Sequence, residues 1–156
     1  MPRQLDRLLV DVPFFDGLGE DELALLAGCA RNVRFDAGAY VFREGDPADV
    51  FYVVRHGSVA LEAFVPAGGP VMIETIDAGE VLGWSWLFPP YRWHFDARAL
   101  ATVRATAFDG ACLRDKCAAD PALGYRLMGR FAQVLIERLQ WTRLRLLDVY
   151  GDAARS

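Results

Sequence analysis

Residues 36–59 read DAGAYVFREGDPADVFYVVRHGSV, and this stretch decides the fold class. It contains two apolar runs, Tyr40–Arg43 and Val50–Arg55, separated by the turn signal Glu44-Gly45-Asp46 and followed by a second one, His56-Gly57. Runs rich in Val, Phe and Tyr between such turns are typical of β-strands. Glycine suits the turns because it adopts a positive φ without a Cβ clash. The stretch therefore predicts short antiparallel strands joined by tight reversals.

The same alternation continues on both sides of this stretch. The further expected strands are Val33–Phe35, Ser58–Phe64, Val71–Ile76, Ala97–Ala101 and Ala105–Asp109. Short strands at fairly even spacing indicate an antiparallel sandwich or barrel. Helical periodicity flanks the strands. Before the strands it covers Asp16–Arg31, and after them it returns from Asp115 onward. Within this second region, Asp120-Pro121 is a typical helix start.

The expected fold class is mostly β with flanking helices, an antiparallel β-roll or double-stranded jelly roll plus a long C-terminal helix. We expect a single domain over residues 1–156. Its parts would be an N-terminal helical part at about 1–32, a β-roll over 33–113 and C-terminal helices over 114–151.

The C-terminal helix carries an apolar stripe at three- and four-residue spacing. Its members are Met128, Phe131, Leu135, Leu139, Thr142, Leu146 and Val149. Gly151 would end the helix. Because a stripe of about 30 residues is too long for a domain of this size, we expect it to pack on a second copy as a coiled coil. The alternative is a helix that lies wholly on its own barrel.

Composition narrows the class of protein. Hydrophobic residues make up 53% and charged residues 24%, which is typical of a globular chain. The net charge of −4 argues against general nucleic-acid affinity. The sequence has no bilayer-spanning apolar stretch and no signal-peptide core, so a cytoplasmic protein without membrane contact is expected. The three cysteines have no Cys-x-x-Cys spacing, and we expect thiols.

The order of these elements resembles the sensor half of the CRP/FNR family, the cyclic-nucleotide-binding domain. The resemblance rests on Pro13-Phe14-Phe15-x-Gly17-Leu18, residues 37–54, Gly57-Ser58-Val59, Ala97-Arg98-Ala99-Leu100 and residues 137–144. It implies a β-roll that senses a ligand and regulates, with a dimerisation helix. Regulators of that family continue into a helix-turn-helix, which this sequence lacks after its long helix, so direct DNA binding is not expected.

The segment that matches the family's ligand cassette is altered. Gly83 matches the cassette glycine, but Trp84 stands where the resemblance implies a ribose-binding Glu. The implied phosphate-binding Arg falls at Trp93, with His94 beside it. Three of the four tryptophans lie in this segment. The expected ligand-binding residues are Gly83, Trp84, Ser85, Trp86, Arg92, Trp93, His94 and Phe95.

These residues predict a ligand-sensing regulatory module whose ligand is an aromatic or apolar small molecule. One alternative is a true cyclic nucleotide held by atypical contacts, with Arg92 turned inward. Another is a dimerisation or interaction module whose rings fill the old pocket. His94 has no second ligand at metal spacing, so no metal site is expected. The sequence shows no catalytic motif, and we expect no enzyme.

Overall fold

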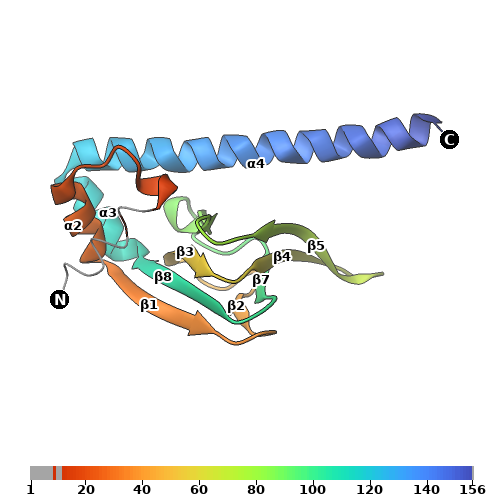
Figure 1. The fold of residues 1–156 in the computed structure, drawn as a ribbon, viewed down its shortest axis with the longest axis horizontal. Helices are drawn as coiled ribbons and strands as arrows, with labels where there is room; N and C mark the ends of the chain where they lie inside the picture. The colour runs from red at the N-terminus through yellow and green to blue at the C-terminus, as the bar shows by residue number, and fades with distance from the viewer. Residues whose placement is uncertain (1–8, 10–11, 156) are drawn as a thin grey trace.

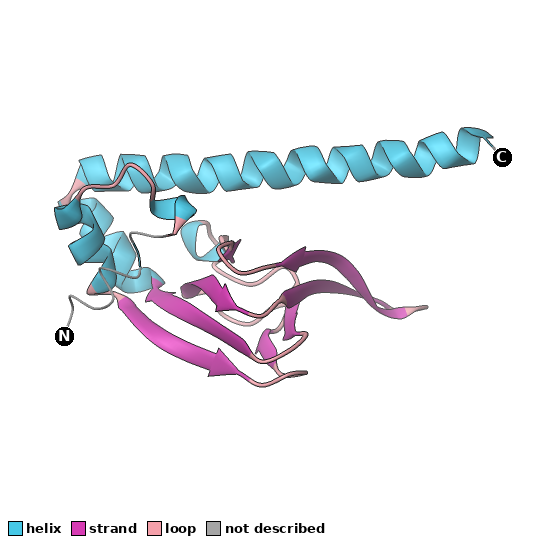
Figure 2. Cartoon of the chain, in the orientation of Figure 1, coloured by secondary structure: helices cyan, strands magenta, loops and turns pink. Residues whose placement is uncertain are grey.

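The computed structural model describes residue 9 and residues 12–155, excepting the side chains of 145, 146 and 148–155. The strands form a roll, and the helices lie on one side of it. One long helix runs along this side (Figures 1 and 2). The far end of this helix projects beyond the roll (Figure 1). The expected fold class is confirmed.

Eight antiparallel strands form two four-stranded sheets in the described part of the chain. The strands are β1 (Ala30–Phe35), β2 (Tyr40–Phe42), β3 (Val50–His56), β4 (Val59–Val65), β5 (Gly69–Ile76), β6 (Val81–Leu82), β7 (Asp96–Ala99) and β8 (Val103–Asp109). The sheet orders are β1-β8-β3-β6 and β2-β7-β4-β5. The expected strands therefore exist, each shifted at its ends by a few residues. Only the two-residue β6 was not expected.

Turn glycines set the register of the strands. Gly57 has φ +85°, and a Cβ at this position would lie 2.4 Å from the carbonyl oxygen of Thr102. A side chain is therefore excluded on both conformational and steric grounds. This close approach fixes the β3–β4 turn against the chain that enters β8.

The helical elements lie along one side of the roll (Figure 1). They are the 3₁₀ turns η1 (Pro13–Phe15) and η2 (Ser85–Leu87) and the helices α2 (Glu20–Ala27), α3 (Gly110–Ala119) and α4 (Pro121–Arg155). At the start of α4, the Asp120 carboxylate accepts a hydrogen bond from the Leu123 amide at 3.2 Å, which confirms the expected Asp120-Pro121 cap. The expected stop at Gly151 is wrong, since α4 continues to Arg155. One glycine costs a long helix only about 1 kcal/mol, too little to end it.

The core has two parts. Inside the roll, Phe42, Leu61, Ile76, Leu82 and Trp93 pack between the two sheets. Between the roll and the helices, the rings of Phe14, Phe15, Phe51, Trp86, Phe108 and Phe131 form a second cluster. Phe131 was expected in the dimerisation stripe, but it is buried on its own roll. The apolar face that packs on the roll instead runs through Leu123, Leu127 and Phe131.

A disulfide joins Cys29 and Cys112, so the expectation of free thiols is wrong for these two residues. They are 83 residues apart in sequence, but the pairing of β1 with β8 brings them together. Cys117 is a free thiol. Sequence spacing could not reveal the bridge, because only the sheet register places its two ends in contact.

Candidate functional site

The cassette follows β6 and passes through η2 to β7. Its first residue, Gly83, has φ +96°, and a Cβ there would lie 2.6 Å from the Trp93 ring. The Trp93 ring stacks on Phe42 of β2 with 3.8 Å between ring centroids and 8° between ring planes. Only 6% of Trp93 is exposed. The indole therefore lies between the cassette glycine and β2, inside the roll.

Stacking of Trp93 leaves little space in the cassette pocket. The remaining cavity is about 20 Å³ and is lined by Phe42, Leu61, Gly83, Trp84, Ser85, Trp93, His94 and Phe95. Pockets that hold small molecules measure about 300–1,000 Å³. Neither Lys nor Arg is among the described residues that line the cavity. In this conformation the pocket has neither the room nor the cation that a cyclic phosphate needs.

Six of the eight residues expected to bind ligand come together here, and Trp86 and Arg92 do not. Trp86 is 1% exposed and packs on Phe51 and Phe131 in the core beneath the helices. Arg92 is exposed, and its Nη1 donates a hydrogen bond to the Gly45 carbonyl at 2.8 Å. The guanidinium of Arg92 is thus engaged on the outer turn, away from the cavity lining.

Arg138 of α4 contacts the cassette from the helical side, a residue that sequence reasoning did not assign to the site. Its guanidinium lies 4.8 Å from the centroid of the Trp84 ring. Its Nη2 donates a hydrogen bond to the Val81 carbonyl, and its Nε lies 3.6 Å from the Glu74 carboxylate. Only 11% of the side chain is exposed, and burial lowers the pKa of this guanidinium. Nη1 is buried and has no hydrogen-bond partner among the residues that the structure describes.

A signal for Arg138 existed in the sequence. Leu127, Phe131, Val134 and Arg138 follow one another at spacings of four, three and four residues. This spacing places Arg138 on the face of α4 that packs against the roll. A cation on an otherwise apolar inner face needs a partner inside the protein.

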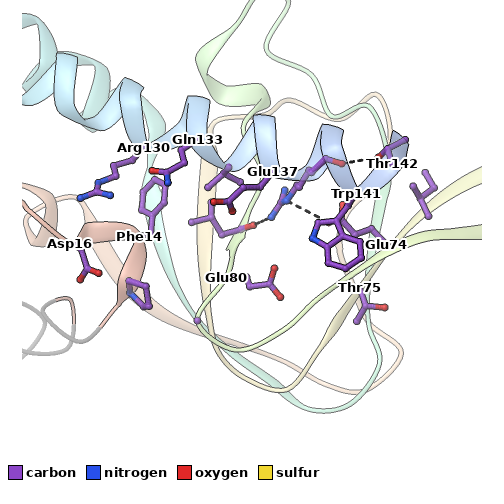
Figure 3. A pocket seen from close by; sticks show the side chains of 16 residues that line it. Phe14, Asp16, Glu74, Thr75, Glu80, Arg130, Gln133, Glu137, Trp141 and Thr142 are labelled. Carbon is purple, nitrogen blue, oxygen red and sulfur yellow. Dashed lines mark hydrogen bonds and ion pairs between the residues drawn. The ribbon is translucent and has the colours of Figure 1, made fainter. Parts of the chain in front are cut away.

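An open groove of about 660 Å³ lies beside Arg138, between α4 and the edge of the roll (Figure 3). Arg130, Gln133, Glu137, Arg138, Trp141 and Thr142 line it from α4, and Ile73, Glu74, Thr75, Glu80 and Val81 line it from the roll. The lining mixes polar and apolar side chains and carries more carboxylates than guanidiniums. Glu80 accepts a hydrogen bond from the Asp77 amide at 3.0 Å, which anchors it to the β5–β6 turn.

The described residues offer neither a metal-binding cluster nor a membrane-spanning helix. No group of three or more His, Cys, Asp or Glu side chains is placed to hold a metal ion. Within the same part of the chain, no helix has the length and apolarity that crossing a bilayer requires.

Comparison with known proteins gives consistent matches. A model of the cyclic nucleotide-binding domain matches residues 32–120. The chain is similar to the CRP-like cAMP-activated global transcriptional regulator of Mycobacterium tuberculosis, with 28% identity over 145 residues, 93% of this chain and 63% of the regulator. It is 34% identical over 134 residues to glutaminase 1 of Bradyrhizobium diazoefficiens, a match that covers 84% of this chain and 21% of the glutaminase.

A solved structure shares the fold as well. The N-terminal domain of a transcriptional regulator from Streptomyces coelicolor A3(2) is 27% identical, with a TM-score of 0.70, and the match covers 86% of this chain and 94% of that one. The chain therefore spans less than two thirds of the length of the curated relatives just described, and it matches 94% of the solved N-terminal domain. Together with the two-sheet roll and the cassette after β6, these matches show that the chain belongs to the cyclic nucleotide-binding domain family.

Proposed function

We propose that this chain is a regulatory sensor domain whose pocket has changed specificity from a cyclic nucleotide to a flat aromatic or apolar small molecule. The observation that carries the proposal is the stacking of Trp93 on Phe42 inside the pocket. A ring already lies where the ligand of a β-roll sensor would lie. A flat apolar ligand can take its place against Phe42, with a stacking geometry that aromatic pairs prefer.

The polar groups of the pocket support the same ligand class. Ser85 and His94 are its hydrogen-bonding side chains besides the Trp84 indole, and none of them carries a fixed positive charge. An ionised phosphate buried there would lack a cation, which is costly. Small neutral or weakly polar ligands avoid that cost.

The signal would pass from the cassette to α4 through Trp84 and Arg138. A ligand that displaces Trp93 also disturbs the neighbouring Trp84, because both rings line the same cavity. Trp84 stacks under the Arg138 guanidinium, so its movement changes a contact of α4. Since α4 is the longest element and extends past the roll, a small shift at Arg138 is larger at its far end.

We also propose that α4 forms a homodimer. In a heptad reading, Tyr125, Ala132 and Leu139 occupy one core position and Met128, Leu135 and Thr142 the other. Of these, Tyr125 is 84% exposed and Leu139 is 52% exposed, so the described part of the chain leaves both largely uncovered. The expected residues Leu146 and Val149 continue the repeat, but their side chains lie outside the described ones.

The small volume of the cassette cavity favours a second candidate function, that of a ligand-free dimerisation module. A pocket of about 20 Å³ suits a domain that binds no ligand and acts through its helix as a dimerisation module. In either case we propose that the domain does not itself catalyse a reaction or bind DNA. The net charge of −4 supports the absence of DNA binding.

Thermal unfolding and tryptophan fluorescence of the full chain test these proposals, with cyclic AMP, cyclic GMP and a panel of indoles and aromatic acids as probes. If the specificity is altered, at least one aromatic probe should raise the melting temperature, and the two cyclic nucleotides should leave it unchanged. A rise with cyclic AMP at micromolar concentration overturns altered specificity. No response to any probe overturns the sensor proposal and supports the ligand-free module.

A further inference from the structure

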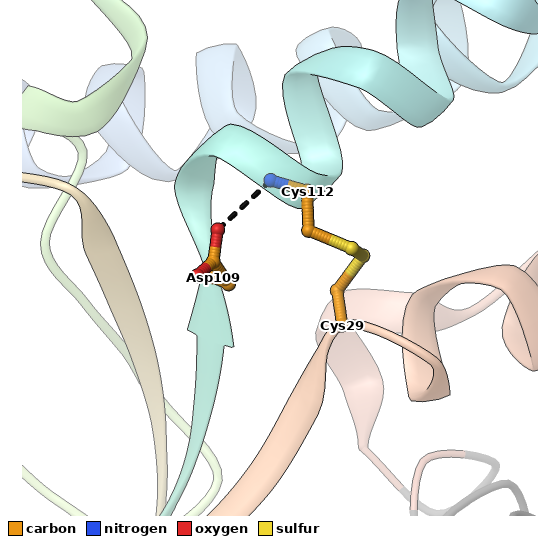
Figure 4. Close-up of a disulfide and its surroundings, with 3 residues drawn as sticks. All are labelled: Cys29, Asp109 and Cys112. Carbon is orange, nitrogen blue, oxygen red and sulfur yellow. Dashed lines mark hydrogen bonds between the residues drawn. A yellow bond between two sulfur atoms is a disulfide. The ribbon is translucent and has the colours of Figure 1, made fainter.

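The disulfide between Cys29 and Cys112 closes a loop that contains the whole β-roll. Cys29 follows α2 and precedes β1, and Cys112 lies in the first turn of α3, just after β8 (Figure 4). All eight strands lie between the two sulfurs. The bridge therefore joins the point where the chain enters the roll to the point where it leaves.

Hydrogen bonds hold the two ends together independently of the bridge. The Asp109 amide donates to the Cys29 carbonyl at 2.9 Å, and Ala30 is paired with Phe108 in the β1–β8 ladder. The Asp109 carboxylate accepts from the Cys112 amide at 2.8 Å and so caps α3 (Figure 4). We therefore expect the two sulfurs to remain neighbours after reduction, which is the condition for the bridge to re-form.

The bridge also determines how firmly α3 is held. Helix α3 is the link between β8 and α4, and the two helices are in close contact: a Cβ at Gly124 would lie 3.2 Å from the Cys117 Cβ. The disulfide attaches the first turn of α3 covalently to β1. Breaking it removes this covalent cross-link and leaves α3 held by its cap, its packing and hydrogen bonds such as that from Arg114 to the Trp86 carbonyl at 2.6 Å.

We propose that Cys29 and Cys112 are a reversible thiol–disulfide site, and that the oxidised form locks α3, and with it the base of α4, to the roll. The co-reactant is a low-molecular-weight thiol. Cys112 is the partly exposed sulfur-bearing residue of the pair and Cys29 is buried, so attack occurs at Cys112.

The exchange balances with two thiols. The first thiolate attacks the Cys112 sulfur, the bond to Cys29 breaks, and Cys29 leaves as a thiolate that takes up a proton. The second thiolate attacks the mixed disulfide, releases the small oxidised disulfide and leaves Cys112 reduced. Two electrons pass from the small thiols to the protein, and an excess of the small disulfide reverses the process.

The chemistry is tested on the full chain by alkylation before and after native reduction, read by intact mass. We expect one alkyl group on the denatured, unreduced chain, at Cys117, and three after incubation with reduced glutathione and denaturation. Glutathione disulfide should restore the first pattern. Three alkyl groups before reduction, or a bridge that does not re-form, overturn the site.

The locking role is tested by stability and hydrogen exchange. Because the bridge closes a long loop, reduction should lower the melting temperature of the wild type and of C117S by about 10 °C. The double variant C29S/C112S should not respond to reductant. Reduction should speed amide exchange in Gly110–Ala119 and leave the β4–β5 pair unchanged. Equal exchange in α3 in both forms overturns the lock. The comparison of oxidised with reduced wild type needs no variant, so it stands even where the double variant does not fold.

Discussion

The guanidinium of Arg138 lies 4.8 Å from the centroid of the Trp84 ring, and this contact joins α4 to the altered cassette. The same side chain bonds to the Val81 carbonyl and faces the Glu74 carboxylate. Three parts of the roll thus meet at one residue of the helix. Because Arg138 contacts the cassette, the packing of the inner face of α4 depends on the conformation of the cassette.

Replacement of Arg138 by Ala should destabilise the fold by about 2 kcal/mol, because it removes one charge-assisted hydrogen bond, an ion pair and a cation–π contact. Chemical denaturation measures the change. The matched control is Arg143→Ala, whose exposed side chain should change stability by less than about 0.5 kcal/mol. Equal effects of the two substitutions would show that Arg138 does not link helix and roll.

Trp93→Ala should remove the ring that fills the pocket. The expected loss is about 3–5 kcal/mol, typical of a large aromatic ring removed from a core. Because the cavity left behind is apolar and bordered by Phe42, indole added in solution should raise the melting temperature of the variant by more than that of Tyr125→Ala, in which the pocket is intact. If indole leaves the melting temperature of Trp93→Ala unchanged, the pocket has collapsed in the variant.

Gly83→Ala should destabilise the cassette, whereas Gly129→Ala should not. The first substitution places a methyl group 2.6 Å from the Trp93 ring at a φ of +96°. The second adds a methyl group on α4 that meets no atom within 4 Å outside the nearby turns of the helix. It should stabilise the fold by up to about 1 kcal/mol. Opposite signs in denaturation curves are the expected result. A neutral Gly83→Ala would mean that the cassette readily moves away from β2.

Leu139→Glu should shift the protein from dimer to monomer, since it places a charge in the proposed seam of α4. Sedimentation velocity measures the change across a range of protein concentrations. Gln140→Glu adds the same charge at the next residue, outside the seam, and should leave the dimer intact. Dissociation by both variants, or a monomeric wild type, would count against the proposed interface.

The stability contributed by Cys117 should depend on pH. Burial, and then the Asp120 carboxylate, raises the pKa of its thiol. The unfolded chain therefore ionises first, so this contribution is complete below the unfolded-state pKa and is lost as the pH rises through and above it. Between about pH 8 and 10 the wild type should lose more stability than C117S. If the free energy of unfolding falls with pH equally in the two proteins, the pKa of the Cys117 thiol is not raised by folding.

Patterns along the chain were enough to predict the strands and the class of fold. Alternating apolar runs and positive-φ glycines act locally, and the turn at Gly57 shows that such a signal survives in the folded protein. The Asp120-Pro121 cap is equally local. Six of the eight cassette residues line one small cavity, because they form two short runs, 83–85 and 93–95, at the two ends of the cassette; that they bind a ligand stays a prediction.

Only the tertiary structure decided what those residues contact. The direction of Phe131 depends on which side of α4 faces the roll, and an apolar spacing alone cannot separate that face from a dimer seam. The filled pocket depends on β2 lying opposite the cassette, which brings Phe42 under Trp93. The Cys29–Cys112 bridge depends on the β1–β8 register. Each is a contact between residues distant in sequence, and such contacts exist only once the chain has folded.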